Sequence, residues 1–182
     1  MKLSDRVLWT LVVIALLGVF VMTVGVFRGM EDHLRSAGAA GGVVALELAF
    51  TPARALALID AWPADGIAVA QRALWLDIVY IALYASGLAA ACTLIARHGP
   101  GGWARWGRRL TPLPLVAALL DVIENVNLLL VVQRAGAGAE LSPFTYLATL
   151  CATVKFALIA VTLVFLLLYA LRWVWQRLRS AG

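Results

Sequence analysis

The sequence predicts an all-α integral membrane protein that folds as a four-helix bundle. Hydrophobic residues make up 63% of the chain and charged residues only 14%, with a mean hydropathy of +0.92. A soluble domain of this size would need more polar surface to cover itself. The apolar residues fall in four long blocks, each able to supply the roughly 20 residues that a membrane-spanning helix needs. Four such helices and their loops use the whole length, which predicts a single domain over residues 1–182.

The ends of the predicted spans follow from helix-capping residues. Ser4 is an N-cap candidate for the first span, and Ser142-Pro143 supplies a cap and an N1 proline for the fourth. Gly18 and Gly25 lie a heptad apart in the first span and would allow a close helix contact. The spans are predicted at about residues 7–27, 73–96, 114–132 and 143–171.

The region between the first two spans is too interrupted to cross a membrane again. A charged piece follows the first span, then a small-residue linker at 36–42, then an apolar stretch around Glu47. Thr51-Pro52 is a favourable N-cap and N1 pair for a short helix that reaches about Trp62. We therefore expect an interfacial or re-entrant segment at about residues 43–62, within an extended helical region that faces outward.

The orientation in the membrane follows from the lysines and arginines outside the spans. Nine of them fall at the termini and in the loop between the second and third spans, against five on the other side. Both termini of this multi-pass protein are therefore predicted to be cytoplasmic, in a bacterial-type inner membrane. The nine are Lys2, Arg6, Arg97, Arg105, Arg108, Arg109, Arg172, Arg177 and Arg179, and the five are Arg28, Arg35, Arg54, Arg72 and Arg134.

The formal charge of +5 does not indicate a nucleic-acid partner, because the basic residues gather at the membrane edges. They are typical of topology signals and of contacts with lipid headgroups, so the lipid bilayer is the first predicted partner. The stretch from Trp103 to Arg109 combines tryptophans with arginines and could bind anionic headgroups, although a positive-inside loop explains it nearly as well.

A group of polar residues interrupts the apolar third span. Asp121, Glu124, Asn125 and Asn127 fall on one arc of about 160° at 100° per residue, so they share a face of the helix. An ionised carboxylate at the bilayer centre costs roughly 2.5 to 3.5 kcal/mol, which excludes a lipid-facing position. The sequence therefore predicts that this face looks into the bundle.

The neighbouring spans supply further polar groups at similar depths. The second span carries Asp77, with Tyr80 and Tyr84 on the same side, and the fourth carries Lys155. At 1.5 Å per residue, Lys155 and Asp121 both lie about 17 Å from the outer surface, which predicts an ion pair between them.

The predicted site is then an acidic pocket that opens outward. Asp77 and the two tyrosines would lie near its mouth, and the outward segment with Glu47 would be its lid. The other interpretation is structural, because polar residues also hold membrane helices together. One lysine does not neutralise three carboxylates, however, and this imbalance favours a functional site. The predicted ligand-binding residues are Glu47, Asp77, Tyr80, Tyr84, Asp121, Glu124, Asn125, Asn127 and Lys155.

The sequence does not identify a cofactor, and we predict no metal site. Neither His33 nor His98 has a second histidine at ligand spacing, and we interpret them as a solvated loop residue and a residue at a helix C-terminus. Cys92 and Cys151 lie at different predicted depths, so we expect core packing rather than a disulfide.

Three classes of function fit this pattern. The first is a protein that binds or transports a cation, a proton or an amphipathic molecule with a cationic head, using carboxylate charge and tyrosine faces. Four spans are few for a transporter, so a homodimer would be one way to form a pathway. The second is an enzyme that performs acid–base chemistry on a lipid or sterol-like substrate, with Glu124 and Asp121 as catalytic groups. The third is a non-catalytic assembly subunit.

The predicted architecture resembles that of the EXPERA group of small membrane proteins, which includes sterol isomerases. The likeness consists of four spans, an outward segment after the first span, and acidic residues in the pocket. Isomerisation of a lipid double bond would suit a site with such acidic groups. The resemblance aligns no individual motif residue, so it assigns no roles.

Overall fold

The computed structural model describes residues 3–180 of the chain, and all of its regular structure is helical. Four continuous stretches are long and apolar enough to cross a membrane: Asp5–Arg35, Gly66–His98, Gly102–Gly136 and Phe144–Ser180. The prediction of an all-α protein with four apolar helices is confirmed. The elements are α1 (Asp5–Val21), the π-helix η1 (Met22–Phe27), α2 (Arg28–Arg35), α3 (Val43–Glu47), α4 (Pro52–Asp60), α5 (Gly66–His98), α6 (Gly102–Leu110), α7 (Leu113–Gly136) and α8 (Phe144–Ser180).

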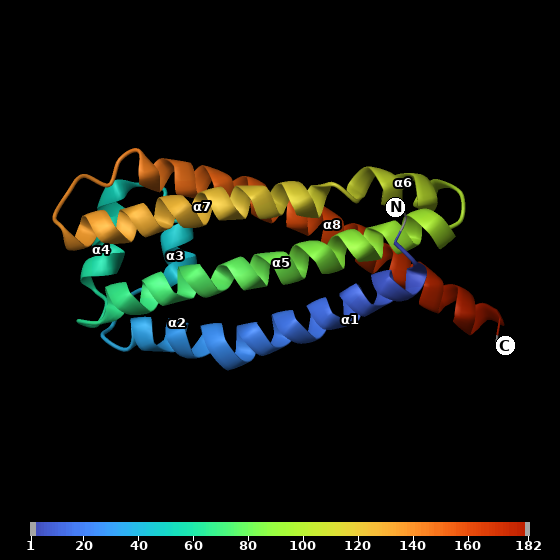
Figure 1. Ribbon diagram of the computed structural model, residues 1–182, viewed down its shortest axis with the longest axis horizontal. Helices are drawn as coiled ribbons and strands as arrows, with labels where there is room; N and C mark the ends of the chain where they lie inside the picture. Colours follow the sequence, from blue (N-terminus) through green and yellow to red (C-terminus); the bar gives the residue numbers. More distant parts are fainter. Residues whose placement is uncertain (1–2, 181–182) are drawn as a thin grey trace.

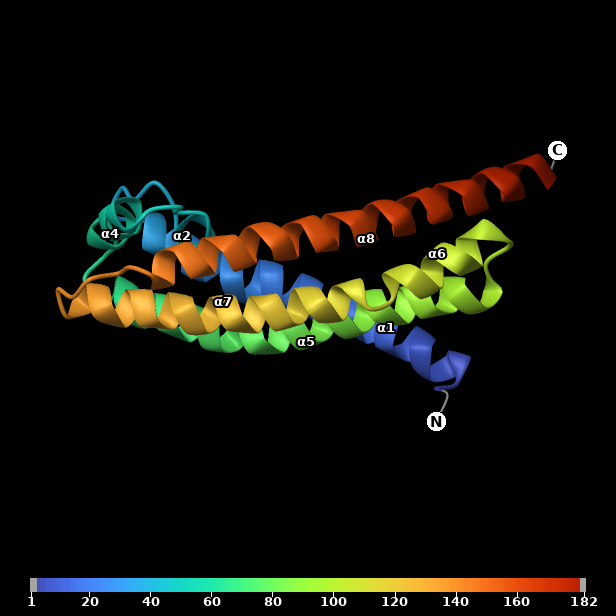
Figure 2. The same cartoon turned by 90° about the horizontal axis from the view of Figure 1, so that it is seen from above.

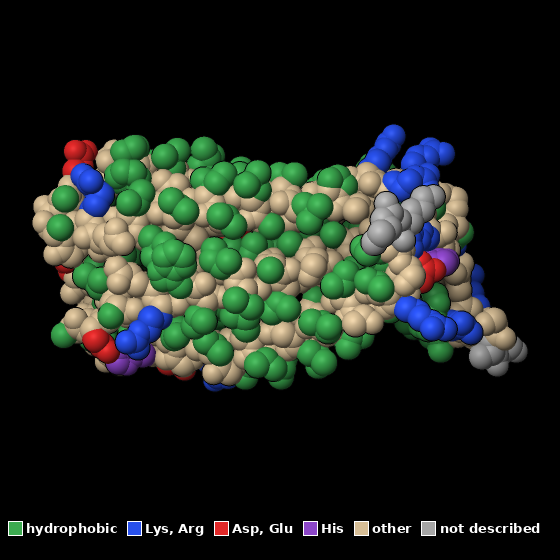
Figure 3. Space-filling model, in the orientation of Figure 1, with side chains coloured by type: hydrophobic (Ala, Val, Ile, Leu, Met, Phe, Trp, Pro, Cys, Tyr) green, Lys and Arg blue, Asp and Glu red, His purple; other side chains and the backbone are tan. Residues whose placement is uncertain are grey.

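The outer surface of the long helices is apolar. Leu16, Leu17 and Phe20 of α1 and Leu167 of α8 are all largely exposed. On the face shown in Figure 3, hydrophobic side chains cover the middle of the molecule, while charged side chains gather at its two ends. Such a distribution suits a bilayer, whose hydrocarbon core is about 30 Å thick. Together with the four long helices, it indicates a multi-pass membrane protein.

Capping residues begin the helices close to the predicted positions. Ser4 Oγ accepts a hydrogen bond from Val7 N at 3.4 Å, and Thr51 Oγ1 accepts one from Arg54 N at 3.3 Å. α5 begins at Gly66 rather than near residue 73, because the helix continues beyond the apolar block through a more polar turn.

The long helices pack in the order α1, α5, α7 and α8, each against the next. The first and last of them, α1 and α8, share no extensive contact, and α5 touches α8 only slightly. Figures 1 and 2 show α8 lying beside α7 and diverging from α1 toward the end that holds both termini. The bundle is therefore a row of helices that is not closed between α1 and α8.

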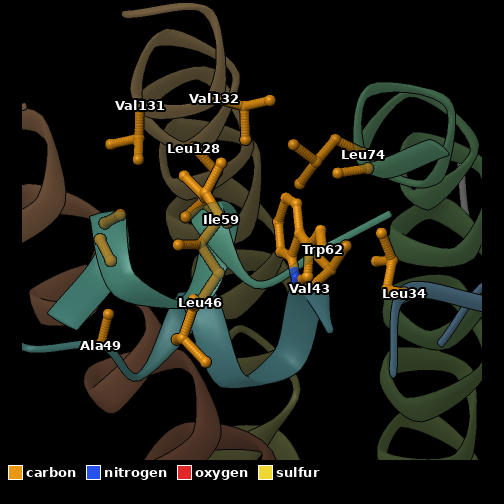
Figure 4. Packing of buried hydrophobic residues seen from close by; sticks show 14 of the residues in the cluster. Leu34, Val43, Leu46, Ala49, Ile59, Trp62, Leu74, Leu128, Val131 and Val132 are labelled. Carbon is orange, nitrogen blue, oxygen red and sulfur yellow. The ribbon is translucent and has the colours of Figure 1, made fainter. Parts of the chain in front are cut away.

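One end of the bundle is covered by α3 and α4. Their apolar side chains form a buried cluster with α2, α5 and α7, in which Leu34, Leu46, Trp62 and Leu74 meet (Figure 4). Trp62 Nε1 donates a hydrogen bond to Gly41 O at 3.0 Å, so the buried indole has its polar group satisfied. This packing fixes α3 and α4 on the bundle end.

The start of α1 and the end of α8 lie at the other end of the bundle, together with α6 (Figure 1). Asp5 connects the start of α1 to the end of α5, since its carboxylate accepts a hydrogen bond from Arg97 at 2.6 Å and contacts His98 Nε2 at 2.7 Å. The start of α1 and the loop before α6 therefore lie at the same end.

Candidate ligand-binding site

Lys155 of α8 is the centre of a buried ionic cluster. Its Nζ lies 2.6 Å from Asp121, 2.8 Å from Glu124 and 3.4 Å from Glu47. The predicted ion pair between Lys155 and Asp121 is thus present, and two further carboxylates share the same ammonium group. The lysine also lies 4.9 Å from the ring centroid of Phe156. One cation therefore joins α3, α7 and α8.

Glu124 is the most enclosed member of the cluster, with no exposed surface. Although its carboxylate approaches Lys155, neither oxygen makes a hydrogen bond of normal geometry. Buried carboxylates are ordinarily hydrogen-bonded as well as paired, so Glu124 is an exception that calls for an explanation. It depends on the charge of Lys155 alone.

Two side-chain hydrogen bonds join α5 to α7, and each has a carboxylate as its acceptor. Tyr84 OH donates to Asp121 Oδ2 at 2.8 Å, and Asn125 Nδ2 donates to Asp77 Oδ2 at 2.8 Å. The same Asn125 amide is 3.3 Å from Leu74 O. Asp77 thus has an amide partner but no cation within 4.0 Å among the described residues. These contacts fix the register between α5 and α7.

The tyrosines of α5 face the first span. Tyr80 OH lies 3.5 Å from Thr23 Oγ1, and its ring meets that of Phe27 edge to face at 5.5 Å between centroids. The rings of Tyr80 and Tyr84 also meet edge to face, with 6.0 Å between their centroids. Thr23 and Phe27 belong to η1, and π-helical turns of this kind occur frequently at functional sites.

Glu47 reaches the cluster because α3 is held firmly in place. Glu31 Oε1 accepts a hydrogen bond from Val44 N at 3.2 Å and so caps the start of α3, while Phe50 N donates to Thr149 Oγ1 of α8 at 3.2 Å. Burial raises the pKa of the Glu47 carboxyl from 4.5 to about 7, although nearby Lys155 acts to lower it.

A cavity of about 840 Å³ lies beside this cluster, between α1, α5 and α8. It follows the first helical stretch from Val12 to Met30, which is about 27 Å at 1.5 Å per residue. Its acidic and hydroxyl groups are concentrated toward α3, and the remainder is apolar. The apolar wall includes Val12, Leu16, Val19, Leu88, Ala91, Ile159, Leu163, Leu166 and Ala170.

The predicted site residues divide into two groups. Six of them line the cavity: Glu47, Asp77, Tyr80, Tyr84, Asp121 and Lys155. Three are buried but do not line it: Glu124, Asn125 and Asn127. Asn127 does not bond to the acidic cluster through its amide, which donates to Ile123 O of its own helix at 2.7 Å.

Other wall residues could not be identified from charge or polarity. α1 and η1 contribute a stripe at helical spacing, of which Val12, Leu16, Val19 and Thr23 are members. The only signal was that spacing, which an ordinary packing face shares. Glu31 also lines the cavity, and its Oε2 is buried without a hydrogen bond.

The histidines and cysteines lie outside the cavity wall. His33 contacts Asp65 at 2.9 Å, which holds the pKa of that carboxyl below its usual range. His98 contacts Asp5, and both cysteines are buried and free. Among residues 3–180, no group of three or more His, Cys, Asp or Glu side chains is arranged to hold a metal ion.

Comparison with known proteins gives no match: no family model, no curated protein and no solved structure is similar to this chain. None of these comparisons supports the predicted resemblance to the EXPERA group. The site has to be interpreted from its own residues.

Proposed function

We propose that this protein binds an amphipathic molecule with a cationic head in the cavity between α1, α5 and α8. The observation that carries the proposal is the composition of the cavity wall. Carboxylates of Glu31, Glu47, Asp77 and Asp121 lie on one part of it together with Lys155 and hydroxyl groups, and apolar side chains line the rest. A ligand with a charged head and a long apolar part matches both regions.

The size of the cavity favours such a ligand over a bare cation or a proton. Its volume of about 840 Å³ falls in the range of roughly 300–1,000 Å³ that small-molecule sites occupy. Along α8, the apolar wall continues from Lys155 to Ala170, about 22 Å by helical rise. An apolar wall of that length matches the apolar part of an amphipathic ligand, whereas the passage of an ion or a proton does not require it.

The excess of carboxylates around the cavity favours a ligand with a cationic head group. Lys155 is the sole cation within 4.0 Å of Glu47, Asp121 and Glu124 in the described part of the chain, and Asp77 has only an amide partner. A cationic head beside Asp77 and Asp121 would offset the excess negative charge, and Tyr80 and Tyr84 offer aromatic faces for it.

The geometry supports the enzyme alternative less well. Glu124, the acid that such a reaction would use, is buried and does not line the cavity, whereas Lys155 beside it does. A general acid has to come within hydrogen-bond reach of its substrate, directly or through one water molecule. We therefore propose ligand binding rather than catalysis.

We further propose an inner-membrane location with both termini cytoplasmic. The basis is the excess of lysine and arginine at the end that holds both termini and α6. In this orientation α3 and α4 face outward, and the acidic part of the cavity lies in the outer half of the membrane.

The test measures the thermal stability of the purified chain in a neutral detergent with hexadecyltrimethylammonium, hexadecanol or hexadecyl phosphate added. We expect the cationic compound to raise the melting temperature by several degrees and the other two to have little effect. Asp77→Asn should abolish this increase, because Asp77 faces the cavity without a cation. Asp32→Asn, at an exposed position outside the cavity, is the matched control. Equal stabilisation by all three compounds, or an unchanged response in Asp77→Asn, would overturn the proposal.

A further inference from the structure

A second groove lies on another side of α8, away from the cavity described above. Its volume is about 530 Å³, and it is bounded by α6 and by the middle of α8. All of its side chains are apolar or aromatic. Its lining residues are Gly102, Trp103, Trp106, Leu110, Val161, Val164, Phe165 and Leu168.

Two arginines lie against the aromatic walls of this groove. The guanidinium carbon of Arg109 is 5.4 Å from the centroid of Trp106, and that of Arg172 is 5.8 Å from the centroid of Trp103. Trp103 in turn contacts the rings of Phe165 and Tyr169. The indoles therefore fix two positive charges at the edge of an apolar surface.

These charges have no acidic counterpart nearby. Within residues 3–180, no carboxylate lies within 4.0 Å of Arg105, Arg108, Arg109 or Arg172. In Figure 3, basic side chains accumulate at the end of the molecule where Figure 1 shows α6. An anion at this edge would meet several unpaired guanidinium groups, which are suited to bidentate contacts with phosphate.

The distance along α8 from Arg172 to the far end of the groove matches one leaflet of a bilayer. From Arg172 to Val161, α8 covers about 16 Å at 1.5 Å per residue. Half of a hydrocarbon core is about 15 Å thick. The arginines thus lie at headgroup level, and the apolar lining extends to the depth that an acyl chain reaches.

We propose that this groove is a binding site for one anionic phospholipid, with its phosphate between Arg109 and Arg172 and an acyl chain along Val161, Val164 and Leu168. A second copy of the chain fits the same face poorly, because it would bring two unpaired arginine clusters together. Free phosphate would leave the apolar lining unused. The proposal is independent of the cationic ligand, which occupies the other cavity.

The experiment is native mass spectrometry of the full chain after exchange into nanodiscs of phosphatidylglycerol or of phosphatidylcholine. We expect a retained phosphatidylglycerol adduct and little retained phosphatidylcholine. Arg109→Gln together with Arg172→Gln should weaken phosphatidylglycerol retention about thirtyfold, as expected for two basic groups at an anionic membrane surface. Arg54→Gln together with Arg72→Gln, at the opposite end, is the matched control and should retain the lipid.

A second variant tests the apolar part of the site. Leu168→Trp fills the groove while leaving both arginines in place, so it should also reduce lipid retention. Four results would overturn the proposal: equal retention of both lipids, an unchanged adduct in the double arginine variant, complete displacement by inorganic phosphate, or a lipid-free dimer that Leu168→Trp dissociates. Asp77→Asn should leave the adduct intact, which separates this site from the cavity.

Discussion

Lys155 has an unusual position at the scale of single residues, because one ammonium group serves three carboxylates on two different helices. Asp121 and Glu124 come from α7 and Glu47 from α3, and all three approach Nζ within 3.4 Å. Burying an ion is expensive unless it is paired, so removal of the shared cation leaves several uncompensated charges. The lysine should therefore matter more to stability than any single carboxylate does.

Lys155→Met is accordingly predicted to destabilise the protein by about 3–5 kcal/mol, the usual cost of breaking a buried ion pair from one side. Glu124→Gln conserves shape and removes one of the excess charges, so its effect should be much smaller. Thermal unfolding in detergent, monitored by circular dichroism, would give the order of the two melting temperatures. Combining Lys155→Met with Asp121→Asn and Glu124→Gln should recover part of the loss. If Glu124→Gln were the more damaging substitution, the shared-cation geometry would be wrong.

The titration of Glu47 leads to a prediction about pH. Burial raises the pKa of its carboxyl from 4.5 to about 7, so the folded state holds this proton more tightly than the unfolded state does. The stability that this contributes is fully present below pH 4.5 and is lost as the pH rises toward about 7. The groups facing Glu47 are Lys155, Asp121, Glu124 and Asp77.

Melting temperatures measured from pH 4.5 to pH 8 should therefore fall more steeply for the wild-type chain than for Glu47→Gln. The amide keeps the shape of the side chain and does not titrate. Parallel curves for the two proteins would show that Glu47 keeps its ordinary pKa in the fold.

Spacing along a helix predicts which polar residues lie inside the bundle, but not which hydrogen bonds each side chain makes. Asp121, Glu124 and Asn125 were placed inside the bundle by the cost of exposing them to lipid, and all three are buried. Asn127 is also buried, yet its amide bonds to the backbone of its own helix. Periodicity gives the face on which a residue lies, whereas competing local acceptors decide its hydrogen bonds.

At the scale of helices, the starts of α1 and α4 were predictable because Ser4 and Thr51 cap them locally. The docking of α3 was not, since it depends on Glu31 capping Val44 across a loop and on Phe50 bonding to Thr149. Such contacts join residues far apart in the sequence, and no local pattern indicates them. The cavity could not be predicted from local patterns either, because it exists only where α1 and α8 do not pack together.

Gly18 of α1 and Gly87 of α5 both allow a close approach between these two helices, and the tighter contact is at Gly87. A Cβ atom added at Gly87 would lie only 2.3 Å from Ala15 Cβ, whereas one added at Gly25 would meet nothing within 4 Å. We predict that Gly87→Ala destabilises the protein by about 1–3 kcal/mol, because α1 has to move off α5. Gly25→Ala should be neutral or slightly stabilising. Thermal unfolding of the two variants gives the comparison, and equal effects would mean that this contact is not tight.

For the whole molecule, the predicted orientation in the membrane depends on the unequal number of arginines at its two ends. The end with both termini holds α6 and most of the arginines, while the other end carries α3, α4 and the α7–α8 loop. An even number of spans places both termini on the same side, and that much follows from the helices themselves. Which side it is depends on the positive-inside rule, which counts residues such as Arg105 and Arg109 near the ends of spans.

Cysteine labelling tests this orientation directly. In a chain with Cys92→Ala and Cys151→Ala, a cysteine replaces either Arg54 of α4 or Arg105 of α6, both of which are exposed in the fold. A maleimide that cannot cross membranes should label Arg54→Cys in intact spheroplasts and should label Arg105→Cys only after lysis. The reason for this expectation is the positive-inside rule, by which segments rich in arginine are retained on the cytoplasmic side during insertion. The opposite pattern would turn the acidic part of the cavity toward the cytoplasm, and its ligand would then have to come from inside the cell.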